Sequence, residues 1–304
     1  MPAYSHRPET GRSRLIAIGL MCGAVLCFSL LDTSAKWLAG HMDPLQVVFA
    51  RYAGSMILVS LLLNPWSHPG ILRTKKPWLQ AIRSLLLLGS TALNFFALKY
   101  LQLAETVSIM FATPLLVALV SGPLLGEWPG PRRLAAIGIG FIGVLVITRP
   151  GFGGMHPAAL LCMIGVVCYA FYSLTTRLLA AFDPPETTMV YSGVAGTVAM
   201  LPLIPLFWTW PEGPLPWALM LVTGAMGGFG HWLLILAHRL APATVLAPFI
   251  YSQIVWMVTL GYLVFGQLPD RWTFIGAAIV ISSGLYLLYR ERVRAVPEGS
   301  ARLD

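Results

Sequence analysis

Ionisable side chains occur inside long apolar runs of this chain, where a charge without a partner is costly. Asp32 and Lys36 stand four residues apart with the acid first, which is the favourable order for an ion pair on one helix face. Arg51 lies inside the following run and needs a carboxylate or helix-end carbonyls as partners. Each of these three residues therefore has two interpretations, a structural partner or a contact with a substrate or a proton.

Two more charged residues, Lys99 and Glu105, flank the start of the fourth apolar run. Their position near the membrane interface favours solvation over a functional contact. Together with Asp32, Lys36 and Arg51, they are the candidates for coupling or gating.

A histidine and several aromatic and amide side chains form a second group. His231 follows the Gly-Gly-Phe-Gly stretch at 227–230, a backbone that invites local unwinding and leaves space beside the ring. Linings of this kind suit a small organic ligand with apolar and polar parts, and hydrogen bonding between helices is the alternative. Tyr172, His231 and Gln253 are expected to face one cavity. The substrate-binding candidates are Tyr169, Tyr172, His231, Gln253, Trp256 and Asn94.

Apolar runs of roughly 17 to 25 residues must position these side chains, because each run can cross a hydrocarbon core of ~30 Å as a helix. The chain has 304 residues, of which 57% are hydrophobic and 11% charged, whereas soluble domains average about 25% charged residues. The composition therefore argues against a soluble enzyme and predicts an all-α integral membrane protein. Its ten expected spans are 15–37, 44–63, 78–97, 103–125, 132–148, 157–180, 186–208, 215–237, 241–264 and 271–289.

Lysines and arginines fall mainly on one side when ten helices are threaded. Fourteen lie on the side of both termini and four on the other, while Arg51 and Arg83 lie inside spans. Cytoplasmic loops carry such an excess, so both termini are expected in the cytoplasm and the chain in the cytoplasmic membrane of a bacterium. Arg83 is expected to extend its charged group to the interface. The net charge of +8 is assigned to orientation against anionic lipid rather than to nucleic acid.

Features of the first half recur about 140 residues later. The pair Asp43-Pro44 recurs as Asp183-Pro184, and Gly126-Glu127-Trp128-Pro129 recurs as Gly266-Gln267-Leu268-Pro269. Each half holds five spans, an odd number, so the second half must enter the membrane from the opposite side. This pattern predicts two inverted five-helix repeats, an arrangement that many secondary transporters use for alternating access.

Short motifs give the chain a resemblance to a known family. They are Ala97-Leu98-Lys99-Tyr100, a following helix with Pro114, the stretch Leu124-Leu125-Gly126-Glu127, and a Gly-rich helix at 137–143. With these motifs the sequence resembles the EamA branch of the drug/metabolite transporter superfamily. One departure is Gln267, where the second repeat of the family often has Glu.

The resemblance implies ten helices in two repeats, with helices 1, 3, 4, 6, 8 and 9 lining a central pathway and helices 5 and 10 peripheral. The expected organisation is a cytoplasmic N-terminal tail at 1–14, a first five-helix EamA repeat at 15–148, a second at 157–289, and a cytoplasmic C-terminal tail at 290–304.

The function expected is secondary transport of a small organic metabolite, an amino-acid-derived compound moved by export through alternating access. The alternative within transport is uptake of a cationic or aromatic metabolite such as S-adenosylmethionine. The alternatives from other classes are an intramembrane enzyme and a non-transporting membrane partner. The expected partners are a small-molecule substrate, the lipid bilayer and, if a proton gradient drives transport, protons. No nucleic acid, cofactor or metal is expected, and the chain is expected as a monomer or a homodimer.

Overall fold

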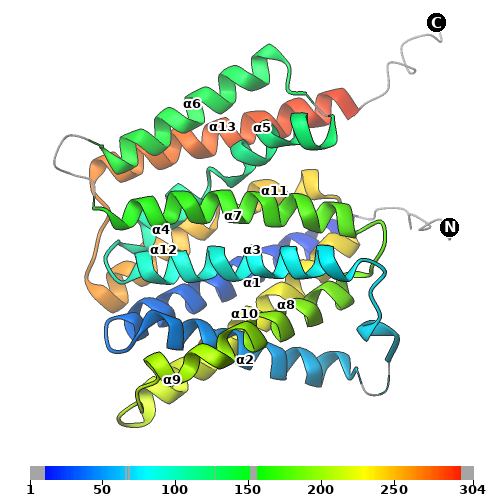
Figure 1. Ribbon diagram of the computed structural model, residues 1–304. Helices are drawn as coiled ribbons and strands as arrows, with labels where there is room; N and C mark the ends of the chain where they lie inside the picture. Colours follow the sequence, from blue (N-terminus) through cyan, green and yellow to red (C-terminus); the bar gives the residue numbers. More distant parts are fainter. Residues whose placement is uncertain (1–10, 66, 68, 127, 151–155, 296–304) are drawn as a thin grey trace, which may run out of the picture.

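The computed structural model of the protein describes residues 11–65, 67, 69–126, 128–150 and 156–295. Ten helical segments in these residues are long and apolar enough to cross a membrane, and none of the described residues is in a strand. Figure 1 shows the start of α1 (Gly11–Ala39) and the end of α13 (Arg271–Ala295) at the same end of the bundle, on the right. This end is termed the terminal end, and the opposite one the distal end. The all-α fold with ten spans is confirmed, and the inversion of the repeat stays a prediction.

The spans between α1 and α13 are built from both continuous and interrupted helices. They are α2 (Pro44–Leu63), α3 (Pro77–Leu98), α4 (Leu103–Met110) with α5 (Thr113–Leu125), α6 (Pro131–Thr148), α7 (Ala158–Leu179), α8 (Pro185–Met200) with η2 (Leu201–Leu203) and α9 (Ile204–Phe207), α10 (Pro214–Leu240), and α11 (Ala243–Ile250) with α12 (Gln253–Phe265). A short 3₁₀ helix, η1 (Pro69–Leu72), lies between α2 and α3.

Proline begins many of these helices because its fixed φ suits the first turn and its missing N–H is not needed there. The five helices that start with proline are α2, α3, α6, α8 and α10. In α2 the preceding residue, Asp43, adds a side-chain cap by accepting a hydrogen bond from the N–H of Leu45 at 2.8 Å. Local sequence therefore sets where the spans begin.

The fourth and ninth spans, expected as continuous helices, are each interrupted near the middle. In the fourth, Pro114 has no N–H for the carbonyl of Met110, and the hydroxyl of Thr113 donates to that carbonyl at 2.7 Å instead. In the ninth, the hydroxyl of Ser252 donates to the carbonyl of Phe249 at 2.6 Å, so it competes with the regular helix ladder. The two hydroxyls are 139 residues apart, and so are the two carbonyls. The interruptions thus occupy matching places in the two halves.

The residues at the two interruptions touch each other. The rings of Phe111 and Tyr251 lie edge to face, with centroids 5.0 Å apart and an interplanar angle of 76°. Both side chains are buried. The two halves of the chain therefore meet where their helices are broken.

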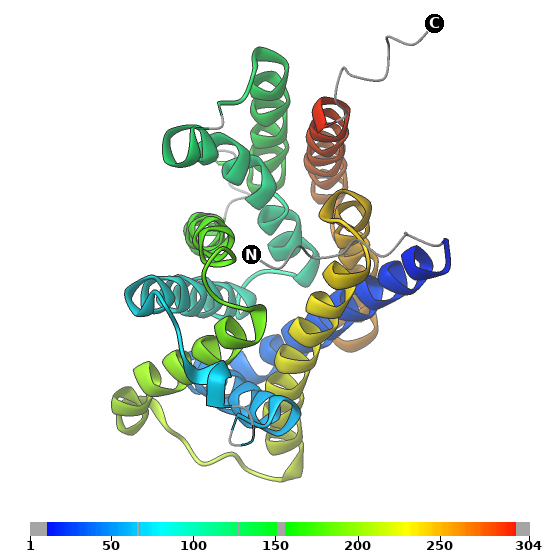
Figure 2. The same cartoon turned by 90° about the vertical axis from the view of Figure 1, so that its right-hand side faces the viewer.

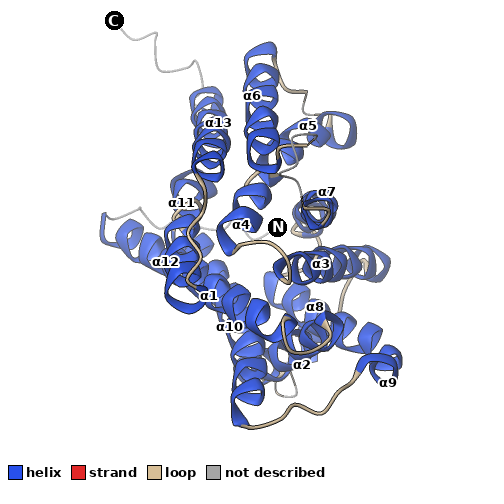
Figure 3. Cartoon of the chain, turned by 90° about the vertical axis from the view of Figure 1, so that its left-hand side faces the viewer, coloured by secondary structure: helices blue, strands red, loops and turns tan. Residues whose placement is uncertain are grey.

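Glycines let helices of different halves approach closely in lipid. A Cβ atom on Gly224 of α10 would lie 2.6 Å from the Cα atom of Gly54 in α2. A Cβ atom on Gly276 of α13 would lie 2.6 Å from the carbonyl oxygen of Gly143 in α6. The pair α6 and α13 lies at the top of the bundle both in Figure 2 and in the opposite view of Figure 3.

Asp183, in the connection between α7 and α8, fastens the start of α3 at the terminal end. Its carboxylate accepts hydrogen bonds from the hydroxyl of Thr74, from the N–H of Lys75 at 3.0 Å and from the amide of Gln80 at 2.9 Å. Burial raises the pKa of Asp183, but these hydrogen bonds and the charge of Lys75 outweigh it, so the net pKa lies below its usual value. The carboxylate therefore holds the segment before α3 and the first turn of that helix together from a distant part of the chain.

We expect Asp183→Asn to lower the free energy of unfolding by about 1–3 kcal/mol, because it weakens hydrogen bonds to a buried charge. A carboxylate whose pKa is depressed by folding stabilises the protein above its unfolded pKa of about 3.9, and this contribution is lost as the pH falls through the lower folded pKa. The difference in thermal stability between wild type and variant in detergent should be steady from about pH 5 to 8 and shrink below about pH 4.

Asp43→Asn is the matched control. Asp43 precedes α2 as Asp183 precedes α8, the equivalent helix of the second half, and asparagine caps a helix as well as aspartate does. Equal losses of thermal stability in the two variants would contradict the special role of Asp183.

Candidate functional site

A chamber of about 530 Å³ is lined by residues of both halves and is termed the main chamber. Spans 1, 3, 4, 6, 8 and 9 all contribute to its wall, as the resemblance implied. Spans 5 and 10, expected to be peripheral, also contribute, through Arg133 of α6 and Leu287 of α13. Arg133 and Arg177 bring the wall to the terminal end of the bundle.

Opposite charges lie on the wall of the main chamber. Asp32 accepts a hydrogen bond from the side-chain amide of Asn94 at 3.3 Å. Arg51 is 7% exposed, stacks on the ring of Tyr52 at 4.5 Å, and has a buried Nε with no hydrogen-bond partner. Neither residue forms an ion pair with any other residue that the structure describes. Both charges are therefore available to a ligand.

The expected ion pair between Asp32 and Lys36 does not form. Lys36 turns instead to the distal end of α3, where its Nζ donates to the carbonyl of Leu98 at 3.0 Å and to that of Leu101 at 2.6 Å. The ring of Phe265 lies 5.4 Å from the same Nζ. Carbonyls at a helix end satisfy a buried ammonium, so Lys36 needs no carboxylate. This arrangement joins α1 to the distal end of α3.

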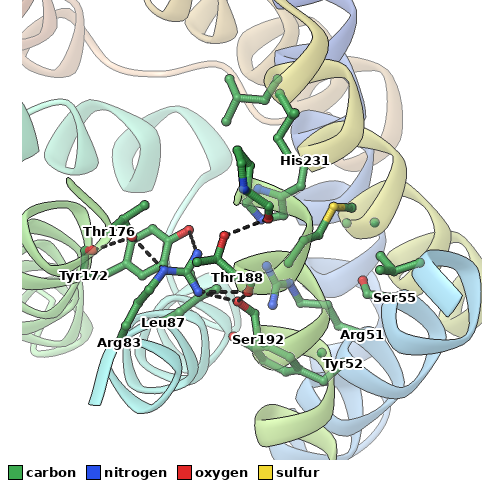
Figure 4. Close-up of a pocket in the computed structure, with 18 residues that line it drawn as sticks. Arg51, Tyr52, Ser55, Arg83, Leu87, Tyr172, Thr176, Thr188, Ser192 and His231 are labelled. Atoms are coloured by element: carbon green, nitrogen blue, oxygen red, sulfur yellow. Dashed lines mark hydrogen bonds between the residues drawn. The ribbon is translucent and has the colours of Figure 1, made fainter. Parts of the chain in front are cut away.

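A smaller chamber of about 170 Å³ adjoins the main one and is termed the side chamber. Arg51 and His231 line both chambers, whereas Arg83 lines only the smaller one. Figure 4 shows Arg83 and Arg51 extending from opposite sides toward the interior of the side chamber.

Arg83 is buried instead of extending to the interface, which corrects the expectation from its position in the sequence. Its Nε donates to the hydroxyl of Thr176 at 2.7 Å, and its terminal nitrogens donate to Ser192 at 2.6 Å, to the carbonyl of Thr188 at 3.1 Å and to the hydroxyl of Tyr172 at 3.0 Å. Hydroxyls of α7 and α8 therefore replace the water that a snorkelling side chain would reach.

Comparison with known proteins identifies the family. The sequence profile of the EamA-like transporter family matches residues 15–149 and again residues 156–290. The chain belongs to the EamA-like transporter family. With ten membrane-spanning segments and membership of a transporter family, it is a multi-pass membrane transporter. The family membership also points away from catalysis.

Relatives of this EamA-like transporter include proteins named for two different substrates. It is 25% identical over 264 residues to the S-adenosylmethionine uptake transporter of Rickettsia prowazekii, covering 87% of this chain and 89% of that protein. It is 27% identical over 288 residues to the riboflavin transporter of Vibrio cholerae, covering 94% and 95%. A solved crystal structure matches with a TM-score of 0.63 at 21% identity, covering 92% of this chain and 99% of that one, which shows the same fold.

Most of the predicted substrate-binding residues of this EamA-like transporter line one of the two chambers. Asn94, Tyr169 and Gln253 line the main chamber, and Tyr172 lines the side chamber. His231 lines both, with its ring 5.1 Å from that of Phe28. The single cavity expected for Tyr172, His231 and Gln253 is thus two adjoining chambers with His231 between them.

The other predicted residues lie away from the chambers. Trp256 is 36% exposed and lines neither of them, so the expectation that it faces the pathway is not met. Lys99 is exposed above the ring of Tyr100. Glu105 accepts from the N–H of Gln102 at 2.9 Å and so caps α4. Of the five candidates for coupling or gating, Asp32 and Arg51 are the two that reach the main chamber.

Two features of the candidate site were not predicted from the sequence. The first is Arg83, which the spacing of Thr188 and Ser192 on α8 could have indicated, because a buried guanidinium needs such acceptors. The second is the interruption of the fourth and ninth spans, for which corresponding broken segments in two halves are the known pointer to a substrate site. Tyr251, at the second interruption, lines the main chamber, and its buried hydroxyl has no hydrogen-bond partner.

Proposed function

We propose that this EamA-like transporter takes up a zwitterionic amino-acid derivative that carries an aromatic group. The observation that carries the proposal is a pair of opposite charges, Asp32 and the buried Arg51, on the wall of one chamber of about 530 Å³. An ammonium group of the ligand would satisfy Asp32, and a carboxylate would satisfy Arg51. A charge in a membrane-spanning segment needs such a partner, and a guanidinium binds a planar carboxylate well.

The rest of the main chamber suits an aromatic ring. Aromatic side chains contribute to its wall from five places in the chain, namely Phe28, Phe95, Phe111, Tyr169 and Tyr251. Ligand pockets commonly measure about 300–1,000 Å³ and combine an apolar wall with a few polar groups. S-adenosylmethionine has both an amino-acid end and an aromatic base, which makes it the first compound to test.

Three considerations support uptake by alternating access at a bacterial cytoplasmic membrane. The excess of positive charge supports a cytoplasmic terminal end, and the main chamber, which reaches that end through Arg133 and Arg177, would then face the cytoplasm. Lys36 joins α1 to the distal end of α3, and such a contact would close that end in one state of an alternating-access cycle. The name of the Rickettsia relative specifies uptake, and for that reason we favour uptake over the export expected from the sequence.

The experiment is a counterflow assay with purified protein in proteoliposomes loaded with unlabelled S-adenosylmethionine. We expect labelled S-adenosylmethionine to accumulate inside, and excess unlabelled compound to compete with it. Adenosine should compete poorly, because it has the aromatic base without the amino-acid end. Riboflavin is the decisive comparison, since the Vibrio relative is named for it and a flavin does not need both charges. Uptake of riboflavin without uptake of S-adenosylmethionine would overturn the proposal.

A further inference from the structure

Among the described residues, the wall of the side chamber carries two positive charges and, unlike the wall of the main chamber, no carboxylate. Arg51 and Arg83 both line it, at 7% and 4% exposure, and no acidic residue contributes to its wall. Figure 4 shows the two side chains entering from α2 and α3 on opposite sides. Two guanidinium groups in a water-poor interior repel each other, and an anion between them offsets that repulsion.

The guanidinium of Arg51 has unused hydrogen-bonding capacity at this place. Its side chain is more than nine-tenths buried, and its Nε is a buried donor with no partner. Arg51 has a ring contact with Tyr52 and forms no direct ion pair with a described carboxylate, although its charge and that of Asp32 interact at longer range. A buried donor without a partner costs about 1–3 kcal/mol, so this atom points to a ligand acceptor.

Arg83 is held rigidly where such a ligand would bind. Three hydroxyl oxygens and one carbonyl oxygen accept from its guanidinium, and these acceptors come from α7 and α8. All four are neutral, so they fix the position of the charge without cancelling it. A rigid planar guanidinium discriminates a carboxylate from other groups better than a mobile ammonium does.

We propose that the side chamber is the carboxylate subsite of the transported molecule, with Arg83 as the residue that makes it selective. This inference rests on the proposed function and assigns the two ends of the substrate to different chambers. The carboxylate enters the side chamber between Arg51 and Arg83, the ammonium group stays with Asp32, and the aromatic part occupies the main chamber. Arg51 and His231, which line both chambers, lie where the two parts of the ligand join.

The test compares two ligands that differ in one group, S-adenosylmethionine and decarboxylated S-adenosylmethionine. Binding to purified protein in nanodiscs is measured for the wild type and for Arg83→Met. In the wild type, removal of the carboxylate should weaken binding at least about tenfold. In Arg83→Met, binding of S-adenosylmethionine should fall at least about tenfold, while binding of the decarboxylated compound should change less than about twofold. Equal weakening for both ligands would overturn the subsite.

Two further variants separate recognition from folding. Arg83→Lys keeps the charge but not the planar fork, so it should retain part of the preference for the carboxylate even where Arg83→Met is too unstable to purify. Arg271→Met removes an exposed arginine at the start of α13 and should leave the preference unchanged. A wild-type preference for the carboxylate that persists fully in Arg83→Lys and Arg83→Met would also overturn the proposal.

A second measurement distinguishes failure of the subsite from failure of the proposed substrate. If the wild type binds neither ligand, S-adenosylmethionine is the wrong compound. Thermal stability is then measured in sodium acetate and in sodium chloride at equal ionic strength, to test whether the side chamber binds a carboxylate. Stabilisation by acetate beyond that by chloride, present in wild type and reduced in Arg83→Lys, supports a carboxylate site. Equal effects of acetate and chloride contradict it.

Discussion

Asp32→Asn should weaken binding of a zwitterionic amino-acid derivative about 30-fold or more, which corresponds to ~2 kcal/mol. Asp32 is the carboxylate of the main chamber, and its one hydrogen-bond partner among the described residues is the amide of Asn94 at 3.3 Å. The substitution removes the negative charge that the ammonium group of the ligand would meet, while an amide of the same shape remains. The measurement is the half-saturating concentration in exchange between two equal pools of substrate, where no gradient drives uptake.

Glu105→Gln is the matched control for this prediction. Glu105 was predicted in the same group as Asp32, but it caps α4 and does not reach either chamber. Glutamine fills the same capping position, so exchange should stay close to that of the wild type. If Asp32→Asn abolishes accumulation driven by a pH gradient yet leaves exchange affinity unchanged, Asp32 carries a proton and does not bind the ammonium group.

Lys36→Met should shift the protein toward a state that is open at the distal end. The ammonium of Lys36 joins α1 to the carbonyls of Leu98 and Leu101, and hydrogen bonds to a charged group contribute about 1.5–3 kcal/mol each. Loss of these bonds should move the equilibrium between closed and open states by about tenfold or more, because 1.4 kcal/mol corresponds to a factor of ten. Methionine retains the length and apolar character of the stem, so the change is chiefly the loss of charge.

Spin labels on cysteines introduced at His41 and Leu268, both exposed at the distal end, report this opening. The four native cysteines are first replaced, since all four are free thiols. We expect a longer-distance population to grow in Lys36→Met. Lys99→Met is the control, because Lys99 is an exposed lysine at the same end whose ammonium group forms no hydrogen bond to a carbonyl of the described residues. Identical distance distributions in the two variants would rule out Lys36 as the distal gate.

The ten spans could be predicted from sequence because a membrane crossing needs a long apolar run, and that requirement is local. The partners of the charged residues could not be predicted in the same way. The four-residue spacing of Asp32 and Lys36 favoured an ion pair, but a lysine with a long stem reached carbonyls 62 and 65 residues away instead. Arg83 was similarly misplaced because its acceptors, on α7 and α8, lie about 90 or more residues later in the chain.

Interruption of the fourth and ninth spans was only partly visible in the sequence. Pro114 marks the first, because proline removes a helix hydrogen bond at a fixed offset. Pro248, inside α11, lies shortly before the second, where the hydroxyl of Ser252 donates to the carbonyl of Phe249. A serine hydroxyl bonds in this way in many unbroken helices, so its presence alone does not predict a break.

The hydroxyl bonds at these two breaks bear on how fast the transporter can cycle. A carbonyl left unpaired in hydrocarbon costs several kcal/mol, and a helix that bends in the membrane would add that cost to its activation barrier. Thr113 binds the carbonyl of Met110, which Pro114 leaves without its helix partner, and Ser252 adds a hydroxyl bond to the carbonyl of Phe249, which backbone N–H groups also bind. Both hydroxyls move with the same turn as the carbonyls that they bind. Each hinge can therefore flex without waiting for water to reach it, and the turnover number need not be limited by hydration of the hinge.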